Sequence, residues 1–353
     1  MPSPTRPASI GTTWLWLAAM CMLMTIGPTL RGAAQRPARP LDAGHSLFLK
    51  SWSAADGLGP LANALSCAAC HASPRTGGGG GHNPDAVVMV TDEERDPTGG
   101  HLFRRLLIRP GRAVVPRPLP RRAFRRRAPS LLGLGLLERL PAAAIAAAAD
   151  PADRNGDQVS GRVPRGAGRF TWKARFATLD GAIAAALVNE LGLTTPAGGE
   201  RTLDGPQVPE ISDQQLAALT AYVRQLPPPT AKGQPGAGES VFVATGCAAC
   251  HVPEIARVPR SAHVRAYTDL LLHDMGPALA DGFPDGDATP QEFRTPPLWG
   301  LGSAGSPFLH DGRAPTLDRA IRLHGGEADA ARARYERLQV AARHALMQFL
   351  NGL

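Results

Sequence analysis

Lysine and cysteine are both scarce in this sequence of 353 residues. Lys50, Lys173 and Lys232 are the only lysines among its 38 basic residues. Of the five cysteines, one lies in an apolar run near the N-terminus, and the other four lie in two short motifs. If the N-terminal run is removed from the mature chain, no cysteine remains for a disulfide or for thiol chemistry. Patterns that predict strands are nearly absent, which favours a mainly helical fold.

Residues 1–34 have the features of a secretory signal peptide. Arg6 precedes an apolar run from Trp14 to Ile26, and small residues follow at positions 32–34. The run is short for a permanent membrane span and has no second basic flank, which favours cleavage over an uncleaved anchor. A lipid anchor at Cys21 is disfavoured because Met20 is large. We therefore expect an exported, periplasmic protein with no stable membrane span after signal removal.

The pentapeptide CAACH occurs twice, at residues 67–71 and 247–251. CxxCH is the attachment signature of c-type haem, in which two thiols bond the haem and the adjoining histidine binds the iron. The alternatives are chance in an alanine-rich chain and a structural zinc site held by two CxxC pairs. Zinc would require the pairs to converge and has no use for a histidine directly after each pair. The motifs favour two covalent haems, bound by Cys67, Cys70, His71, Cys247, Cys250 and His251.

The formal net charge of +8 is concentrated in an Arg- and Pro-rich stretch from Arg104 to Arg127. Such clusters are typical of nucleic-acid binding, but an exported chain meets no nucleic acid. We expect a solvated loop or a docking surface for an acidic redox partner. The propionates of two haems would use some of the arginines.

The duplication extends beyond CAACH. Residues 127–135 (RAPSLLGLG) align without gaps with residues 294–302 (RTPPLWGLG), and residues 170–179 (FTWKARFATL) align with residues 308–317 (FLHDGRAPTL). In both copies of the second block, the threonine just before the final leucine favours a helix start. The predicted helices run from Leu179 to Leu191 and from Leu317 to His324, and each stops before a glycine.

Each copy closes with a longer helix. The residues Ser212-Asp-Gln-Gln215 form a capping box that opens a helix ending before Pro227, and residues 330–350 close the second copy. We predict two tandem cytochrome-c-like helical domains with one covalent haem each. Their boundaries are residues 41–226, with insertions, and residues 239–353, joined by a Pro/Gly-rich linker at 227–238.

The two copies differ at the position that decides the sixth ligand of each haem iron. His324 stands seven residues after Leu317, whereas the matching residue of the first copy is Ala186, which cannot bind iron. Glu190 stands one turn further along the first helix. The sequence predicts a capped second haem, with Met275 as the alternative ligand to His324, and an open first haem. Met89, His82 and His101 remain alternative ligands that would close it.

Two aligned side chains and one insertion complete the candidate residues. Trp172 occupies the position that His310 has in the second copy, and it either passes electrons between the haems or packs in the core. His310 is expected to orient a propionate or to support the iron ligands. In the insertion at residues 150–161, Asp153, Asn155 and Asp157 alternate as in a calcium loop. The bidentate glutamate of an EF-hand is missing, and ordinary turn chemistry explains the same pattern.

The chain resembles the bacterial di-haem oxidoreductase family of putative peroxidases, some members of which are labelled thiol oxidoreductases. The resemblance rests on residues 57–60, 127–138, 150–162, 168–174, 267–276, 294–302 and 308–327. The Arg/Pro-rich stretch departs from the family pattern. The thiol label has no support in a chain without a spare cysteine.

More distantly, the chain is similar to bacterial di-haem cytochrome c peroxidases and to the related enzyme that matures methylamine dehydrogenase. This similarity implies that His324 supplies the distal ligand of the second haem and that Glu190 serves the open haem. The residue matching Met275 is not a ligand in those enzymes. They hold a calcium between the haems, which the similarity does not place at Asp153.

We therefore expect a peroxidase-like oxidoreductase in which electrons enter at the second haem and reduce a peroxide or similar oxidant at the first. Glu190 would move protons and Trp172 would assist electron passage. The donor would be a small redox protein or a quinol-linked donor. The alternative function is an electron-transfer cytochrome with two six-coordinate haems, and a third option is a zinc-bearing structural protein.

Overall fold

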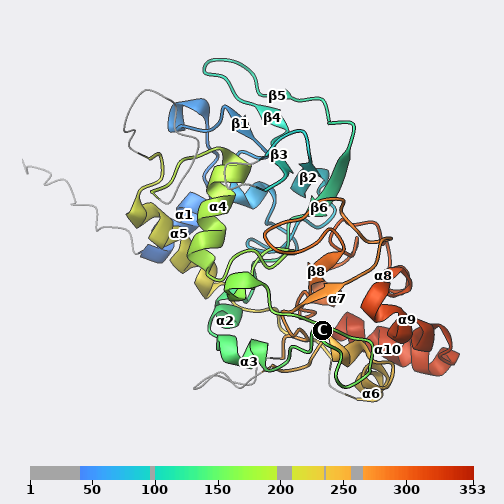
Figure 1. Cartoon of the computed structure of the whole chain (residues 1–353). Coiled ribbons are helices and arrows are strands. Elements are labelled where there is room, and N and C mark those ends of the chain that lie inside the picture. The colour runs from blue at the N-terminus through green and yellow to red at the C-terminus, as the bar shows by residue number, and fades with distance from the viewer. Residues whose placement is uncertain (1–39, 96–99, 197–208, 234–235, 256–264) are drawn as a thin grey trace, which may run out of the picture. The chain divides into compact units, whose positions relative to one another are not determined.

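The computed structural model describes residues 40–95, 100–196, 209–233, 236–255 and 265–353 (Figure 1). The predicted signal peptide lies outside the described residues. The described helices are α1 (Pro40–Leu49), α2 (Leu134–Glu138), α3 (Ala142–Ala146), α4 (Leu179–Leu191), α5 (Asp213–Gln225), α6 (Ala237–Ala244), α7 (Leu301–Ala304), α8 (Leu317–Leu323), α9 (Asp329–Glu336) and α10 (Val340–Gly352). None of them has the length and apolar character needed to cross a membrane.

Eight short strands accompany these helices in the described part of the chain. They are β1 (Leu61–Ala62), β2 (Val87–Thr91), β3 (Leu102–Phe103), β4 (Leu106–Leu107), β5 (Val115–Pro116), β6 (Ala123–Arg127), β7 (Leu272–Asp274) and β8 (Glu292–Arg294). They form three small antiparallel sheets, in the orders β1-β4-β5, β3-β2-β6 and β7-β8. The scarcity of strand signals in the sequence therefore did not exclude strands.

Helix packing repeats between the two copies. Helix α1 packs on α5 in the first copy, and α6 packs on α10 in the second (Figure 1). Gly135 and Gly302, which are aligned in sequence, each face a backbone carbonyl of the closing helix, that of Arg224 and that of Asn351. A Cβ atom at either position would collide with that carbonyl, so the close approach requires glycine in both copies.

The predicted helix starts are present, and the predicted helix ends are partly correct. The hydroxyls of Thr178 and Thr316 accept the backbone N–H groups of Gly181 and Arg319, at 3.2 and 3.1 Å. Helix α4 ends at Leu191, before left-handed Gly192 (φ 63°), as predicted. Helix α8 ends one residue early, at Leu323, and Gly325 has an extended backbone (φ −139°) instead of the left-handed one.

The closing helices also differ from one another. The capping box at Ser212 and Gln215 opens α5 as predicted. The second copy closes with two helices, α9 and α10, where the sequence predicted one continuous segment. The break falls at residues 337–339, and Gln339 has an extended backbone (φ −62°, ψ 153°).

The Arg/Pro-rich stretch is more ordered than the sequence suggested. It contains β4, β5 and β6, and β6 pairs with the whole of β2. Arg104, which is buried, and Arg126, which is largely buried, pair with carboxylates, whereas Arg109, Arg112, Arg121, Arg122 and Arg125 are exposed. A solvated loop is therefore the correct description of only part of this stretch.

The two copies exchange equivalent hydrogen bonds. The backbone N–H of Arg127 donates to the carbonyl of His310 at 2.7 Å, and the backbone N–H of Arg294 donates to the carbonyl of Trp172 at 2.8 Å. These four residues are aligned pairs, so the contact has approximate two-fold symmetry. Thr171 and Leu309, which precede Trp172 and His310, both have a left-handed backbone (φ 72° and 71°). The duplicated sequence thus builds matching halves of one contact between the copies.

Candidate functional site

Both CAACH motifs fold into the same short turn. A 3₁₀ turn at Cys67–Ala69 and another at Cys247–Ala249 bring the backbone N–H of each motif histidine to the carbonyl of its first cysteine, at 3.0 Å in both cases. The four cysteines of these motifs are free thiols. Cys21 lies outside the described residues. Each turn therefore presents two thiols and a histidine together, as covalent haem attachment requires.

The histidines of the two motifs are held in the orientation that metal ligation needs. Nδ1 of His71 lies 3.0 Å from the carbonyl of Pro129, and Nδ1 of His251 lies 3.1 Å from the carbonyl of Tyr267. A carbonyl at Nδ1 fixes the proton there and leaves the lone pair on Nε2 for a metal. Burial lowers the pKa of both imidazoles, to about 4 for His251, so both are neutral at pH 7.

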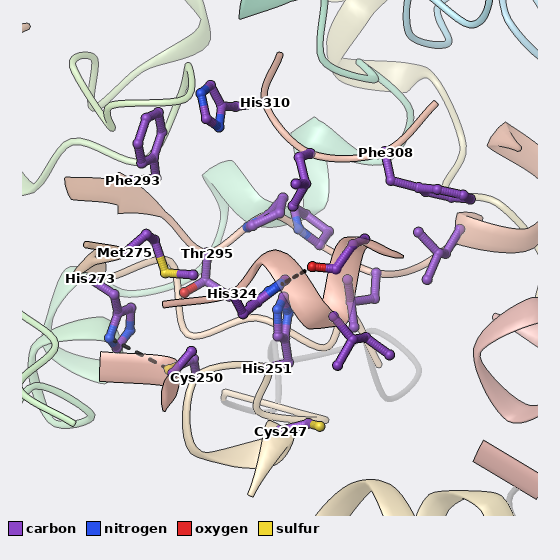
Figure 2. A pocket seen from close by; sticks show the side chains of 18 of the residues that line it. Cys247, Cys250, His251, His273, Met275, Phe293, Thr295, Phe308, His310 and His324 are labelled. Atoms are coloured by element: carbon purple, nitrogen blue, oxygen red, sulfur yellow. Dashed lines mark hydrogen bonds between the residues drawn. The ribbon is translucent and has the colours of Figure 1, made fainter. Parts of the chain in front are cut away.

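A cavity of about 440 Å³ lies beside the second motif (Figure 2). Cys247, Cys250 and His251 line it together with apolar side chains, among them Phe293, Phe308 and Ile321. Cavities of this size and character suit a large, mostly apolar cofactor. The residues present therefore fit a haem at this position.

His324 lies in the same cavity, at the C-terminal end of α8 (Figure 2). Its Nδ1 lies 2.8 Å from the carbonyl of Ala320, which leaves Nε2 for a ligand as in His251. Burial lowers the pKa of His324, and His324 is one of the groups that lower the pKa of His251, which lines the same cavity. Met275 also lines the cavity, so both predicted ligands of the second iron, His324 and Met275, border the same space.

At the first motif, one face of α4 is not buried in the protein core. Ala182, Ile183 and Glu190 are half-buried and Ala186 is exposed, whereas their helical neighbours Ala185, Leu187 and Val188 are buried. Three of the four residues on this face are apolar, as expected of a surface that contacts a cofactor. Ala182 and Ile183 belong to the hydrophobic cluster that Cys67 and Cys70 also join.

Glu190 is anchored beside the first motif. The amide of Asn63, itself buried, donates to Oε2 of Glu190 at 2.8 Å, and the backbone N–H of Asn63 donates to the carbonyl of Glu190 at 2.5 Å. Burial raises the pKa of the Cys70 thiol to about 12, and the charge of Glu190 contributes to the rise. Glu190 is thus a half-buried carboxylate that Asn63 holds near the first motif.

Trp172, His310 and Phe293 form a row of rings along the cavity. Phe293 stacks on His310 at a centroid distance of 4.0 Å, and Trp172 meets His310 edge-on at 6.3 Å. The Trp172 indole donates to the carbonyl of Arg127 at 2.7 Å. His310 is buried and its Nε2 has no hydrogen-bond partner in the part of the chain that the structure describes, so this atom is available to a cofactor in the cavity.

Arg127 and Arg294, another aligned pair, also line the cavity. Arg127 donates to the carbonyls of Pro307 and Gly81, and Arg294 donates to those of Thr171 and Thr295. Neither guanidinium is paired with a carboxylate among the described residues. Burial lowers the pKa of both, to about 10 for Arg294. Buried arginines of this kind are suited to bind the carboxylates of a cofactor.

Some important residues were missed by sequence reasoning. Asp269 and Glu327 hold His273 at 2.8 and 2.6 Å, and its Nδ1 lies 3.5 Å from Cys250 Sγ. Burial opposes its charge, but the hydrogen bonds that the charged ring makes to Asp269, Cys250 and Glu327 raise its pKa to about 12. The close spacing of Asp269 and His273 was the available signal, whereas Glu327 lies far away in the sequence.

The predicted calcium residues lie in an exposed turn. The side-chain oxygens of Asp153, Asn155 and Asp157 accept the backbone N–H groups of Gln158, Asp157 and Val159. Among the described residues, no group of three or more His, Cys, Asp or Glu is placed to hold a metal ion. The turn chemistry is therefore observed, and calcium binding stays a prediction.

The alternative ligands of the first haem have other contacts. Met89 is buried in β2, opposite Phe103 and Arg125. Nδ1 of His101 lies 3.1 Å from the carbonyl of Thr91, and its ring stacks on Phe283. His82 is exposed and lies near Ser306. None of these contacts places the side chain against Cys67, Cys70 or His71.

The duplicated turns and the cavity place paired cysteines and histidines where they could hold cofactors. Residues 179–353 match the model of a family described as "Di-haem oxidoreductase, putative peroxidase". Over this region the chain belongs to the di-haem oxidoreductase family, which implies that haem is its cofactor.

Several solved structures are distantly similar to the chain. Hydrazine synthase from Kuenenia stuttgartiensis has 15% identity and a TM-score of 0.45, with 100% of both chains covered. A MauG-like protein associated with microbial copper homeostasis has 18% identity and a TM-score of 0.42, with 95% of both chains covered. A variant of the di-haem peroxidase BthA from Burkholderia thailandensis has 17% identity and a TM-score of 0.43, covering 90% of this chain and 86% of that one. No curated protein matches the sequence.

Proposed function

We propose that the protein is an exported, periplasmic di-haem c-type cytochrome with peroxidase-like activity. Electrons would enter at the second CAACH motif from a small redox protein or a quinol-linked donor, and a peroxide or similar oxidant would be reduced at the first. The observation that carries the proposal is the asymmetry of the copies. His324 lines the same cavity as His251, whereas the matching Ala186 has no side chain able to bind iron.

The residues that would hold the cofactors follow from the site. Cys67, Cys70 and His71 would hold the first haem, and Cys247, Cys250 and His251 the second, with His324 as sixth ligand. Arg127 and Arg294 would bind haem carboxylates. A haem iron supplies one-electron redox chemistry and, where a coordination position is open, a place for peroxide to bind.

Glu190 is the proposed proton-transfer residue. Reduction of a peroxide to water consumes two electrons and two protons, and cleavage of the O–O bond is easier when a nearby base moves the proton between the two oxygens. Asn63 holds Oε2 of Glu190, which fixes the carboxylate beside the first motif. Trp172, held by Arg127 and Arg294, would assist electron passage.

Low-temperature EPR of the fully oxidised, haem-loaded protein tests the proposal. A high-spin ferric signal beside a low-spin signal is the expected result, since it reports one open and one capped iron. Two low-spin signals that persist after one haem is reduced would favour the electron-transfer cytochrome. A haem stain of the denatured chain separately tests covalent attachment and would be negative for a zinc protein.

A further inference from the structure

Lys173 is fully buried at the contact between the two copies. Its ammonium donates to three backbone carbonyls of the second copy, those of Thr289, Pro290 and Glu292, at 2.9, 3.1 and 2.7 Å. Oδ1 of Asp281 lies 3.3 Å away, and no part of either side chain is exposed. We call these four oxygens the Lys173 cage.

The cage fits a cation and not a neutral amine. A charged ammonium has three N–H donors, which match the three carbonyls, whereas a neutral amine has two. The fourth oxygen carries negative charge, and the ammonium lies 3.6 Å from the centre of the Phe293 ring, whose face attracts cations. Burial lowers the pKa of Lys173 to about 8, with Asp281 opposing the change, so the group is still charged at pH 7.

The charges around the cage favour a monovalent cation. Arg126 pairs with Asp281 and Asp285 at 2.7 and 2.6 Å, and Arg175 pairs with Asp285 at 3.1 Å. The Asp281 carboxylate thus already has a cationic partner in Arg126, so a divalent ion in place of Lys173 would add more buried positive charge than a monovalent ion does, which is costly.

The cage supports one side of the haem cavity. Phe293, which Lys173 contacts, stacks on His310, and both line the cavity. Lys173 follows Trp172 in the chain, and the carbonyl of Trp172 accepts the N–H of Arg294. A cation in the cage therefore holds the segment of Trp172 and the segment of Phe293 together.

We propose that Lys173 is a positioning residue whose ammonium acts as a built-in monovalent cation. We propose also that the cage, once emptied by the Lys173→Ala substitution, binds an alkylammonium ion from solution. The inference concerns the chain around the haems and does not depend on the peroxidase-like function. The Lys173→Ala substitution removes three carbons and the ammonium, which together correspond to n-propylammonium. The ligand class is therefore a small primary ammonium with three N–H donors.

The test compares thermal unfolding of the full, haem-loaded chain with its Lys173→Ala and Lys173→Met variants. We expect both variants to unfold roughly 5 °C or more below the wild type, because the cage oxygens lose their donors. Propylammonium should raise the unfolding midpoint of Lys173→Ala in a saturable way, with no effect from tetramethylammonium at equal ionic strength. Lys173→Met fills the space without a charge and should not respond. Lys232→Ala, at an exposed lysine, is the matched control and should resemble the wild type.

A second readout follows the cavity wall. Circular dichroism in the haem absorption band depends on nearby aromatic rings, so Lys173→Ala should change it and propylammonium should restore it. A variant that responds equally to propylammonium and tetramethylammonium would overturn the proposal. If Lys173→Ala does not fold, the Lys173→Met variant tests the proposal instead. An unfolding midpoint of Lys173→Met equal to that of the wild type would show that the cage requires no cation.

Discussion

The first and second copies share their scaffold and differ at the helix that follows the aligned threonine. Both copies begin this helix at a threonine cap, but α4 runs for 13 residues and α8 for 7. At the position of His324 the second copy leaves the helix with an extended backbone (φ −61°, ψ 132°), whereas Ala186 lies inside α4. The early end of α8 therefore places a histidine in the cavity.

The residues that follow explain the early end. His324 is followed by Gly325 and Gly326, whereas Ala186 is followed by Leu187 and Val188, which are buried in the core. Glycine costs helix stability because its backbone loses the most freedom on folding. Continuation of α4 also carries Glu190 to the first motif. One local change in helix length thus separates a proposed iron ligand in one copy from a proposed proton-transfer group in the other.

Substitutions at the matched positions His324 and Ala186 should have the largest effect, which is on the spin state of the haem iron. We expect His324→Ala to convert the low-spin signal of the second haem to high spin, because the iron loses its sixth ligand. Ala186→His tests the reverse change at the first haem. EPR of the oxidised protein measures both, and a low-spin signal retained in His324→Ala would identify Met275 or another ligand. A double Ala substitution at His324 and Met275 separates those outcomes.

Removing the carboxylate of the first copy should affect turnover without affecting the resting iron. We expect Glu190→Gln to lower the rate of peroxide reduction about 10²–10⁴-fold, the usual contribution of a positioned acid–base group. The EPR spectrum should remain that of the wild type. Steady-state assays with an artificial electron donor measure the rate, and Glu210→Gln, which alters a carboxylate that contacts Thr194, provides the control. Unchanged turnover in Glu190→Gln would remove this residue from the proposed chemistry.

The sequence predicted those parts of the fold and site that depend on local pattern. The CAACH turns, the threonine caps and the limits of α4 are set by residues within a few positions of one another. Lys173 and Arg126 were not predicted as functional, because their partners at residues 281–292 lie more than 100 positions away. The strands of the Arg/Pro-rich stretch were missed because β6 is rich in arginine and owes its strand pairing to β2, far from it in the sequence.

The aligned arginines allow a finer comparison. If Arg127 and Arg294 bind haem carboxylates, Arg127→Gln and Arg294→Gln should each lower a haem midpoint potential on the order of tens of millivolts, since a nearby positive charge favours the reduced iron. The potential should also become more dependent on pH near neutrality, because an unpaired carboxylate gains a proton more readily.

Arg169 provides the matched control for the arginine variants. It is buried and donates to the carbonyls of Leu137, Glu138 and Leu140, but it does not line the cavity. Arg169→Gln should leave both potentials and their pH dependence unchanged. Spectroelectrochemical titration of the three variants across a range of pH measures the effect. Equal shifts in all three would argue against carboxylate binding by Arg127 and Arg294.

The insertion at residues 150–161, which only the first copy has, makes contacts with the second copy. Its Ser160 donates through both N–H and hydroxyl to Glu327, the carboxylate that holds His273. Arg162, directly after it, bonds Glu292 at 2.5 and 2.8 Å and Asp287 at 3.0 Å. The insertion therefore braces the second copy.

The smallest predicted effect is the pH dependence of the Arg162 contact. Burial tends to raise the pKa of Glu292 and Asp287, but their hydrogen bonds, with Arg162 for both and with backbone N–H groups, lower each below its ordinary value of 4.5 or 3.8. Because the folded-state pKa values are lowered, the ionised carboxylates stabilise the folded protein fully above their ordinary pKa values. This stabilisation is lost as pH falls through the lower folded-state values.

We expect Arg162→Gln to lower the free energy of unfolding by about 1 kcal/mol at pH 7, because the pair is partly exposed. Denaturant unfolding of the haem-loaded protein should show this difference shrinking below about pH 4. A difference that is constant from pH 7 to pH 3 would mean that the Arg162 side chain acts by packing and not by its charge.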